Sequence, residues 1–214
     1  PPGVVLGALP QNAPRLGGGP PPAELCAVVK ADAYGHGAVP VARAALGAGA
    51  RSLAVALVEE GIALRDAGID APILVLSEPP VADLVDAVAA GLELTLYRGV
   101  TIAAASAAAV AAGRTVPGHL KVNTGMYRVG AEADEAADLA RAALDAPGLM
   151  LAALCTHCAV ADEPGNDLTE VQLDRFDAAV GNLRAQGIDV PVRHVANSAA
   201  TIDHPRARYE QVRC

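Results

Sequence analysis

The chain has 214 residues, of which 52% are hydrophobic but only 2% aromatic, and its formal net charge is −8. This acidic balance argues against a nucleic-acid or anionic-membrane binder, because such a chain repels phosphates at long range. The high hydrophobic fraction excludes an intrinsically disordered chain. Four cysteines are too few for a disulfide framework, and we see no signal peptide or membrane-spanning run, so we expect a reducing, cytoplasmic compartment.

Short apolar runs alternate with segments of helical period from one end of the chain to the other. We expect strands at Leu25–Val29, Leu53–Leu57, Ile73–Leu76, Leu92–Tyr97, Leu120–Val122, Leu149–Thr156, Val192–Ala196 and Tyr209–Val212. We expect helices at Val39–Leu46, Glu59–Ala67, Val81–Ala90, Ile102–Ala112, Asp134–Leu144 and Leu168–Ala185. Glycine and proline mark the joints between them. Eight apolar strands that alternate with amphipathic helices are typical of parallel βα units, and eight such units predict an α/β fold of the (β/α)8 TIM-like barrel type.

The rival architecture is an open, doubly wound sheet. Its nucleotide-binding version needs a glycine-rich turn directly after the first strand, whereas here Val29 is followed by Lys-Ala-Asp-Ala-Tyr-Gly-His-Gly. We therefore favour the barrel, with residues 25–214 as the barrel domain and residues 1–24 as an N-terminal segment. That segment holds a Gly/Pro-rich loop at 17–22, and Pro10 and Pro14 would break a helix before it. Because a complete barrel takes about 250 residues, we expect one that is incomplete at its C-terminus.

Polar side chains follow several of the predicted strands at the points where those strands end. In a barrel of this type the catalytic groups lie at the carboxyl ends of the strands. The residues in question are Lys30, Asp32, Tyr34, His36, Asn123, Thr124, Met126, Arg128, His157, Asn197, Ser198 and Arg213. They include no cluster of carboxylates, which disfavours a divalent-metal site or a glycosidase-like acid pair.

Lys30 follows an apolar strand directly, and two readings of it are open. A buried ammonium is costly unless it is paired or neutralised, so the side chain could simply extend out of the barrel mouth. It could equally be a Schiff-base lysine, whose amine needs partial desolvation to be nucleophilic.

Four ordered blocks decide between these readings. They are VVKADAYGHG at 28–37, KVNTGMYRVG at 121–130, THCAVADE at 156–163 and HVANSAAT at 194–201, and Val212-Arg213 fits the start of a fifth. Together they resemble the motifs of the bacterial alanine racemases, enzymes that depend on pyridoxal 5'-phosphate. The resemblance covers essentially the whole chain, although Asn123 stands where Asp is common and Tyr127 where a smaller residue is usual.

The resemblance implies a role for each matched residue. Lys30 would hold the cofactor covalently and then act as one of two proton-transfer bases, while Tyr34, Asn197 and Ser198 would bind around its phosphate. His157 would lie against the pyridine ring, and Arg213 would face the ring nitrogen. Since a guanidinium does not give up its proton, that nitrogen would stay unprotonated. Arg128 would contact the phenolic oxygen and the substrate carboxylate, Met126 would line the carboxylate site, and Lys121 corresponds to a position that is carbamylated in some members.

The reaction implied is the interconversion of L- and D-alanine, which supplies D-alanine for cell-wall peptidoglycan. Racemisation needs bases on opposite faces of the substrate. In the family the second base is a Tyr of a C-terminal β-domain, supplied by the partner subunit of a homodimer, and none of the four Tyr of this chain matches it. Alternatives remain open: a racemase of another small amino acid such as serine, a non-catalytic binding module for the cofactor, or an inactive fragment.

Three other motifs have simpler explanations. Cys155 and Cys158 have the CxxC spacing of redox and zinc sites, but no second CxxC follows. The Gly35-His36-Gly37 run favours a tight turn before the next helix over a ligand site. The pair Asp203-His204 favours a polar loop before the last strand over a catalytic dyad.

Overall fold

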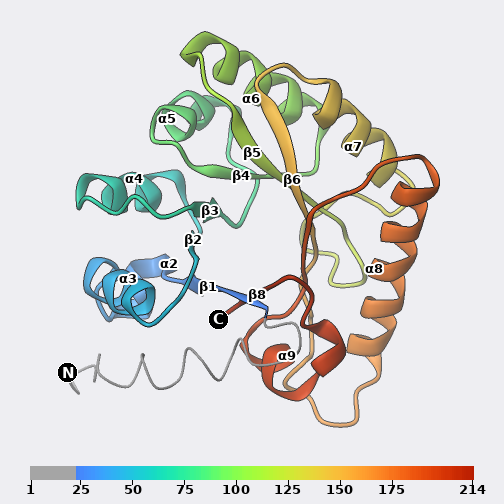
Figure 1. The fold of residues 1–214 in the computed structure, drawn as a ribbon. Coiled ribbons are helices and arrows are strands. Elements are labelled where there is room, and N and C mark those ends of the chain that lie inside the picture. Colours follow the sequence, from blue (N-terminus) through green and yellow to red (C-terminus); the bar gives the residue numbers. More distant parts are fainter. Residues whose placement is uncertain (1–22) are drawn as a thin grey trace.

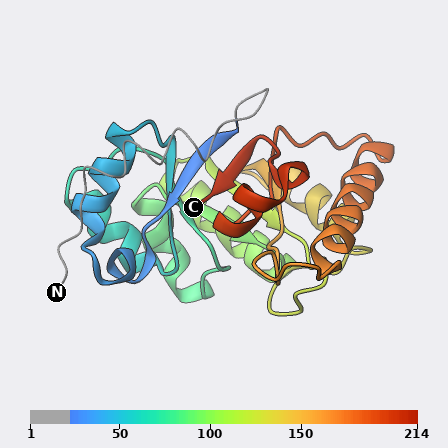
Figure 2. The ribbon, with the colours of Figure 1, turned by 90° about the horizontal axis from the view of Figure 1, so that it is seen from below.

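A closed barrel of eight parallel strands forms the centre of the molecule. The computed structural model describes residues 23–214, so the expectations for the loop at 17–22 and for Pro10 and Pro14 lie outside the described residues. The strands pair in sequence order, and β8 closes the ring against β1, as the red and blue strands in Figure 2 show. They are β1 (Glu24–Val28), β2 (Ser52–Val55), β3 (Ile73–Val75), β4 (Glu93–Leu96), β5 (Val116–Lys121), β6 (Leu149–Cys155), β7 (Val192–His194) and β8 (Gln211–Arg213).

The helices surround the barrel in chain order (Figure 1). They are α2 (Lys30–Gly35), α3 (Ala38–Gly47), α4 (Val58–Asp66), η2 (Val81–Asp83), α5 (Leu84–Ala89), α6 (Gly99–Ala112), α7 (Ala136–Asp145), α8 (Leu168–Ala185), α9 (Ser198–Asp203) and η3 (Pro205–Ala207). Within residues 23–214, no helix is long and apolar enough to cross a membrane.

Two separate apolar clusters stabilise this arrangement. The large one fills the shell between the strands and the helices, where small alanine side chains pack with Leu, Val and Phe176. The small one lies inside the barrel and consists of Cys26, Ala54 and Leu74, with Val28 and Leu76 packed against it. The apolar cluster inside the barrel therefore lies on β1, β2 and β3.

Polar side chains also meet inside the barrel. His119 on β5 and His194 on β7 hydrogen-bond to each other across the interior, since β6 separates their strands. In the same way Gln211 on β8 reaches over β1 to the hydroxyl of Ser52 on β2, at 3.2 Å. Because TIM barrels are usually filled by bulky branched side chains, this polar filling marks the region below the barrel mouth as unusual.

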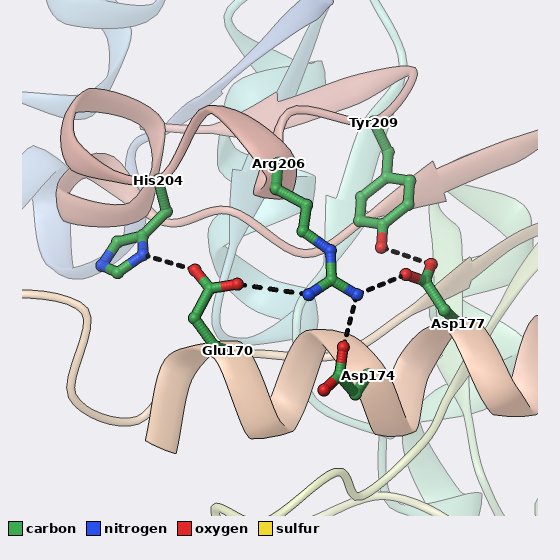
Figure 3. A network of polar contacts seen from close by, with 6 residues as sticks. All are labelled: Glu170, Asp174, Asp177, His204, Arg206 and Tyr209. Atoms are coloured by element: carbon green, nitrogen blue, oxygen red, sulfur yellow. Dashed lines mark hydrogen bonds and ion pairs between the residues drawn. The ribbon is translucent and has the colours of Figure 1, made fainter. Parts of the chain in front are cut away.

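A network of ion pairs joins α8 to the segment that leads into β8 (Figure 3). Arg206 contacts three acidic side chains at distances of 2.6–3.2 Å, namely Glu170, Asp174 and Asp177. Their spacing places all three on one face of α8. Tyr209 donates to Asp177 at 2.6 Å, and His204 lies 3.2 Å from Glu170. Asp203 is the last residue of helix α9 rather than part of a loop, and His204 directly after it belongs to this network.

The structure confirms the predicted fold class and excludes the open sheet. All eight strands overlap their predicted ranges, and the range of α8 matches its prediction. β5 begins at Val116, four residues before its predicted start. The prediction began late because Pro117 and Gly118 interrupt the apolar run of the strand. A side chain at Gly118 would lie 2.8 Å from Leu96, so close packing explains the glycine. The short helices α2 and α9 were not predicted.

Candidate active site

A cavity of about 400 Å³ lies at the carboxyl ends of the strands. Eight of the nine residues to which the family resemblance gives a role line it: Lys30, Tyr34, Lys121, Arg128, His157, Asn197, Ser198 and Arg213. Met126, the ninth, is absent from the lining and sits in the loop after β5. Asp32, His36, Asn123 and Thr124, also noted at the strand ends, do not line it. Among the residues that line the cavity, four are Lys or Arg and none is Asp or Glu. Such a cavity suits an anionic ligand.

Lys30 begins a turn of unusual backbone conformation. The next four residues, Ala31 to Tyr34, have φ values of 51–57°, and none of them is glycine. A left-handed conformation costs about 1–2 kcal/mol per non-glycine residue. Strain of this kind persists only where surrounding contacts hold it, and it is concentrated at functional sites.

Two carboxylates hold this turn in place. Glu60 of α4 accepts a hydrogen bond from the backbone N–H of Ala31 at 2.6 Å through Oε1. Its Oε2 accepts from the N–H groups of Ala56 and Leu57, at 2.7 and 3.0 Å, where the chain enters α4. Asp32 accepts from the N–H of Ala38 at 2.6 Å. Glu60 therefore couples the position of the Lys30 turn to the end of the neighbouring strand β2.

Arg213, the last residue of β8, has its guanidinium buried below the cavity, with 6% of the residue exposed. Nη1 contacts His194 Nδ1 at 2.5 Å and donates to the His194 carbonyl at 3.0 Å. Nη2 donates to the carbonyls of Thr156 and Val195 and lies 3.2 Å from His157 Nδ1. All these partners are carbonyls or imidazole nitrogens, so their geometry fixes the guanidinium without neutralising it.

Charge and burial shift two pKa values in the cavity. Burial lowers the pKa of Lys121, with Cys155 opposing this and the neighbouring arginine and lysine charges reinforcing it. Burial also lowers the pKa of His157 to about 3, and the same cations act in the same direction. His157 is therefore neutral at neutral pH. Lys121 donates to the Leu76 carbonyl at 3.2 Å.

The loop that carries Arg128 is shaped by its own amide side chain and by α8. Asn123 Oδ1 accepts from the N–H groups of Gly125 and Tyr127, at 3.2 and 3.0 Å, and so holds the turn that precedes Arg128. Buried Gln172 of α8 bonds to the Thr124 hydroxyl, to the His157 carbonyl and to the loop after β6. One α8 side chain thus ties two rim loops together.

Cys155 and Cys158 are free and buried, and Cys155 lines the cavity. Within residues 23–214, no group of three or more His, Cys, Asp or Glu is placed to hold a metal ion. Gly35 and Gly37 have φ values of 85° and 91°, consistent with the predicted turn before α3.

Comparison with known proteins identifies the family. The model described as "Alanine racemase, N-terminal domain" matches residues 4–214. The chain belongs to this family. It is 46% identical over 189 residues to an alanine racemase of Symbiobacterium thermophilum, an alignment that covers 88% of this chain and 50% of that relative. The chain spans about half the length of the curated relatives it matches.

Solved structures of alanine racemases have the same fold. The enzyme from Streptomyces lavendulae, a producer of D-cycloserine, superposes with a TM-score of 0.90 at 38% identity, over 97% of this chain and 55% of that one. The Clostridium difficile enzyme in complex with cycloserine gives a TM-score of 0.91 at 32% identity, over 97% and 57% of the two chains. The predicted family and barrel are therefore confirmed. The roles predicted for individual residues of this chain stay predictions.

Sequence reasoning missed several residues that shape this cavity. Glu60 and Gln172 hold the rim loops from neighbouring helices, and His194 holds Arg213 from below. His194 begins one of the recognised blocks, which was a usable signal. The other two carry no local signal, because their role depends on which helix packs beside which loop.

Proposed function

We propose that this chain is the cofactor-binding barrel of a pyridoxal 5'-phosphate-dependent alanine racemase. The observation that carries the proposal is the cavity at the barrel mouth, whose lining has four cations, no carboxylate and a lysine on a strained turn. Pyridoxal 5'-phosphate is an anion with an aldehyde, so it suits both the charge and the amine. Family membership supports the same assignment.

The residues present fit the cofactor. Lys30 would hold it through its amine, the Tyr34 and Ser198 hydroxyls would bind its phosphate beside Asn197, and neutral His157 would lie against its ring. Asn197 is already oriented, since its side chain accepts from Ala200 N at 2.9 Å and caps α9. When bound, the cofactor supplies an electron sink that makes the substrate Cα–H acidic.

Three residues would carry the chemistry of the chain itself. Lys30 would remove or return the Cα proton on one face of the substrate. Arg128, exposed at the rim, would bind the substrate carboxylate through its planar fork. Arg213 would direct an N–H toward the ring nitrogen and keep its own proton there, which limits the electron sink and hence the side reactions. Met126 would help to form the carboxylate site from the same loop as Arg128.

Lys121 has the environment for carbamylation, which we include in the proposal. Burial lowers its pKa, so more of the neutral amine is present to attack CO2. The new N–C bond forms as the amine loses a proton, and the cation becomes an anion beside Arg128 and Arg213. Mass spectrometry of the intact chain in bicarbonate, with Lys121→Met as control, tests this: a gain of one CO2 only when Lys121 is present supports it, and no gain refutes it.

The relatives that this chain matches are about twice the length of the aligned region, and we propose a role for a protein of that full length. It would be a cytoplasmic homodimer that supplies D-alanine for peptidoglycan. Its second proton-transfer group would be a Tyr from the partner subunit's C-terminal domain.

Borohydride reduction with pyridoxal 5'-phosphate, followed by peptide mapping, tests the central assignment. The pyridoxyl group should be fixed on Lys30 as a secondary amine, while Lys30→Arg should take up none. The map is simple to interpret, since Lys30 and Lys121 are the two lysines of the chain. Labelling on Lys121 alone, or equal labelling of the Lys30→Arg variant, would refute the proposal.

Two further measurements separate the alternatives. Proton exchange at Cα of L-alanine in deuterated water should be detectable and abolished by Lys30→Arg. Labelling of Lys30 without exchange would identify a non-catalytic binding module instead. A panel of L-amino acids, assayed with the full-length protein, should favour alanine, and a preference for serine would identify the related racemase.

A further inference from the structure

A continuous chain of polar side chains crosses the barrel interior from the amino ends of the strands to the cavity. It starts at Glu93, the first residue of β4, whose Oε2 lies 3.2 Å from His119 Nε2. His119 Nδ1 lies 2.8 Å from His194 Nε2, and His194 Nδ1 lies 2.5 Å from Arg213 Nη1. β4 begins with Glu93 and β8 ends with Arg213, so the chain joins the amino ends of the strands to the barrel mouth.

The chemistry of the two ends allows one direction of hydrogen bonding. A guanidinium only donates, so His194 Nδ1 must accept and His194 must carry its proton on Nε2. That N–H then donates to His119 Nδ1, which leaves the His119 proton on Nε2. An ionised carboxylate only accepts, so Glu93 receives this last N–H. Both ends therefore demand the same tautomer of both imidazoles.

Burial supports the neutral form of His194. His119 and His194 are 4% and 1% exposed, and burial, together with the Arg213 charge, lowers the pKa of His194 well below its usual value. Protonation of His194 would also place a second donor against Arg213. The chain of bonds does not deliver protons to the cavity, because it ends on a guanidinium, which does not release its proton. Its effect is orientation.

We propose that Glu93 and His119 are positioning residues for Arg213. Through His194 they fix the tautomer that accepts from Arg213, and they hold the guanidinium plane at the floor of the cavity. Neither residue lines the cavity or matches a recognised block. The consequence for catalysis rests on the proposed function, in which Arg213 faces the cofactor ring, whereas the hydrogen-bonded chain itself can be tested without cofactor.

Nitrogen NMR of the histidine-labelled chain tests the arrangement directly. Nδ1 of both imidazoles should show an unprotonated, pyridine-like shift and Nε2 a protonated, pyrrole-like shift. A coupling across the N–H···N bond should join His194 Nε2 to His119 Nδ1. His119→Asn and His194→Asn assign the signals by deleting them. A proton on Nδ1 of either ring, or the absence of the coupling, overturns the proposal.

Two variants of Glu93 test the consequence. Glu93→Gln keeps an oxygen that accepts from His119 and should retain the single tautomer and cofactor affinity within about twofold. Glu93→Leu removes one of the two ends that favour this tautomer and leaves the buried Nε2–H of His119 without an acceptor. A second His119 tautomer should therefore appear, and cofactor affinity should fall about tenfold. If the Leu variant matches the parent in both measurements, the positioning role is refuted. If the parent shows the predicted tautomers but binds no cofactor, the proposed function fails and the hydrogen-bonded chain stands.

Discussion

Two replacements of Glu60 should show how much this side chain contributes to the stability of the fold and how much to the position of the Lys30 turn. Glu60 accepts three backbone hydrogen bonds, at 2.6, 2.7 and 3.0 Å. Hydrogen bonds to charged groups contribute about 1.5–3 kcal/mol each, and partial exposure places these at or below the low end. We therefore expect Glu60→Ala to lower the free energy of unfolding by about 3–4 kcal/mol.

Glu60→Gln should act more selectively. Its single side-chain oxygen can keep the bonds to Ala56 and Leu57, and the amide nitrogen then faces the N–H of Ala31, where no hydrogen bond can form. The stability loss should be about 1–1.5 kcal/mol. Because the strained turn loses its acceptor, affinity for pyridoxal 5'-phosphate should fall about tenfold, which corresponds to ~1.4 kcal/mol.

Urea denaturation followed by circular dichroism measures the first quantity, and cofactor titration followed by absorbance measures the second. The matched control is Glu59→Ala, an exposed residue of the same helical turn. It should change stability by no more than about 0.5 kcal/mol, as ordinary surface substitutions do. The reasoning is refuted if Glu60→Ala behaves like this control, or if Glu60→Gln binds the cofactor as the parent does.

Three further outcomes are expected. Burial holds the pKa of His157 at about 3, below the ~6.5 of the unfolded chain, so the unfolded state binds an extra proton as pH falls from 6.5 toward 3. Stability should therefore drop by ~2 kcal/mol between pH 7 and 5 from this group, and urea denaturation should show the drop reduced in His157→Gln but not in exposed His36→Gln. Gly181→Ala, in open space within α8, should gain up to ~1 kcal/mol, whereas Gly61→Ala, with its Cβ 2.7 Å from a buried leucine, should lose up to ~2 kcal/mol in the same assay. Arg206→Met should lose about 1–2 kcal/mol in low salt, with the loss shrinking in ~1 M salt.

The barrel could be predicted because each of its strands and helices leaves a pattern within a short segment of the sequence. Most strands coincide with a short apolar run, and glycine or proline marks most of the joints. The residues that line the cavity could be predicted because functional groups of this fold cluster at the carboxyl ends of the strands, where Lys30, His157 and Arg213 lie. The family blocks then added roles that the residue types alone left open.

The rest depends on which segments meet in space. Nothing in Ala-Asp-Ala-Tyr predicts four left-handed residues, since their conformation is imposed by acceptors such as Glu60 from the next βα unit. His119 and Glu93 lie on different strands, and their alignment follows from barrel closure and a register irregularity beside His119. Propensity and periodicity describe segments, so they do not report such pairings.

Four cations without a carboxylate and a left-handed, non-glycine turn lie together at the barrel mouth, and this affects how ligand binding and folding are linked. Four cations without a carboxylate raise the free energy of the folded chain alone, because each faces the others in a partly desolvated cavity. The continuous apolar shell between strands and helices offsets that cost. A bound anion would remove the repulsion, and any ligand present at 100 times its Kd adds ~2.7 kcal/mol to stability. The four cations that destabilise the folded chain without ligand are thus the groups that would bind an anionic cofactor and stabilise the folded chain with it.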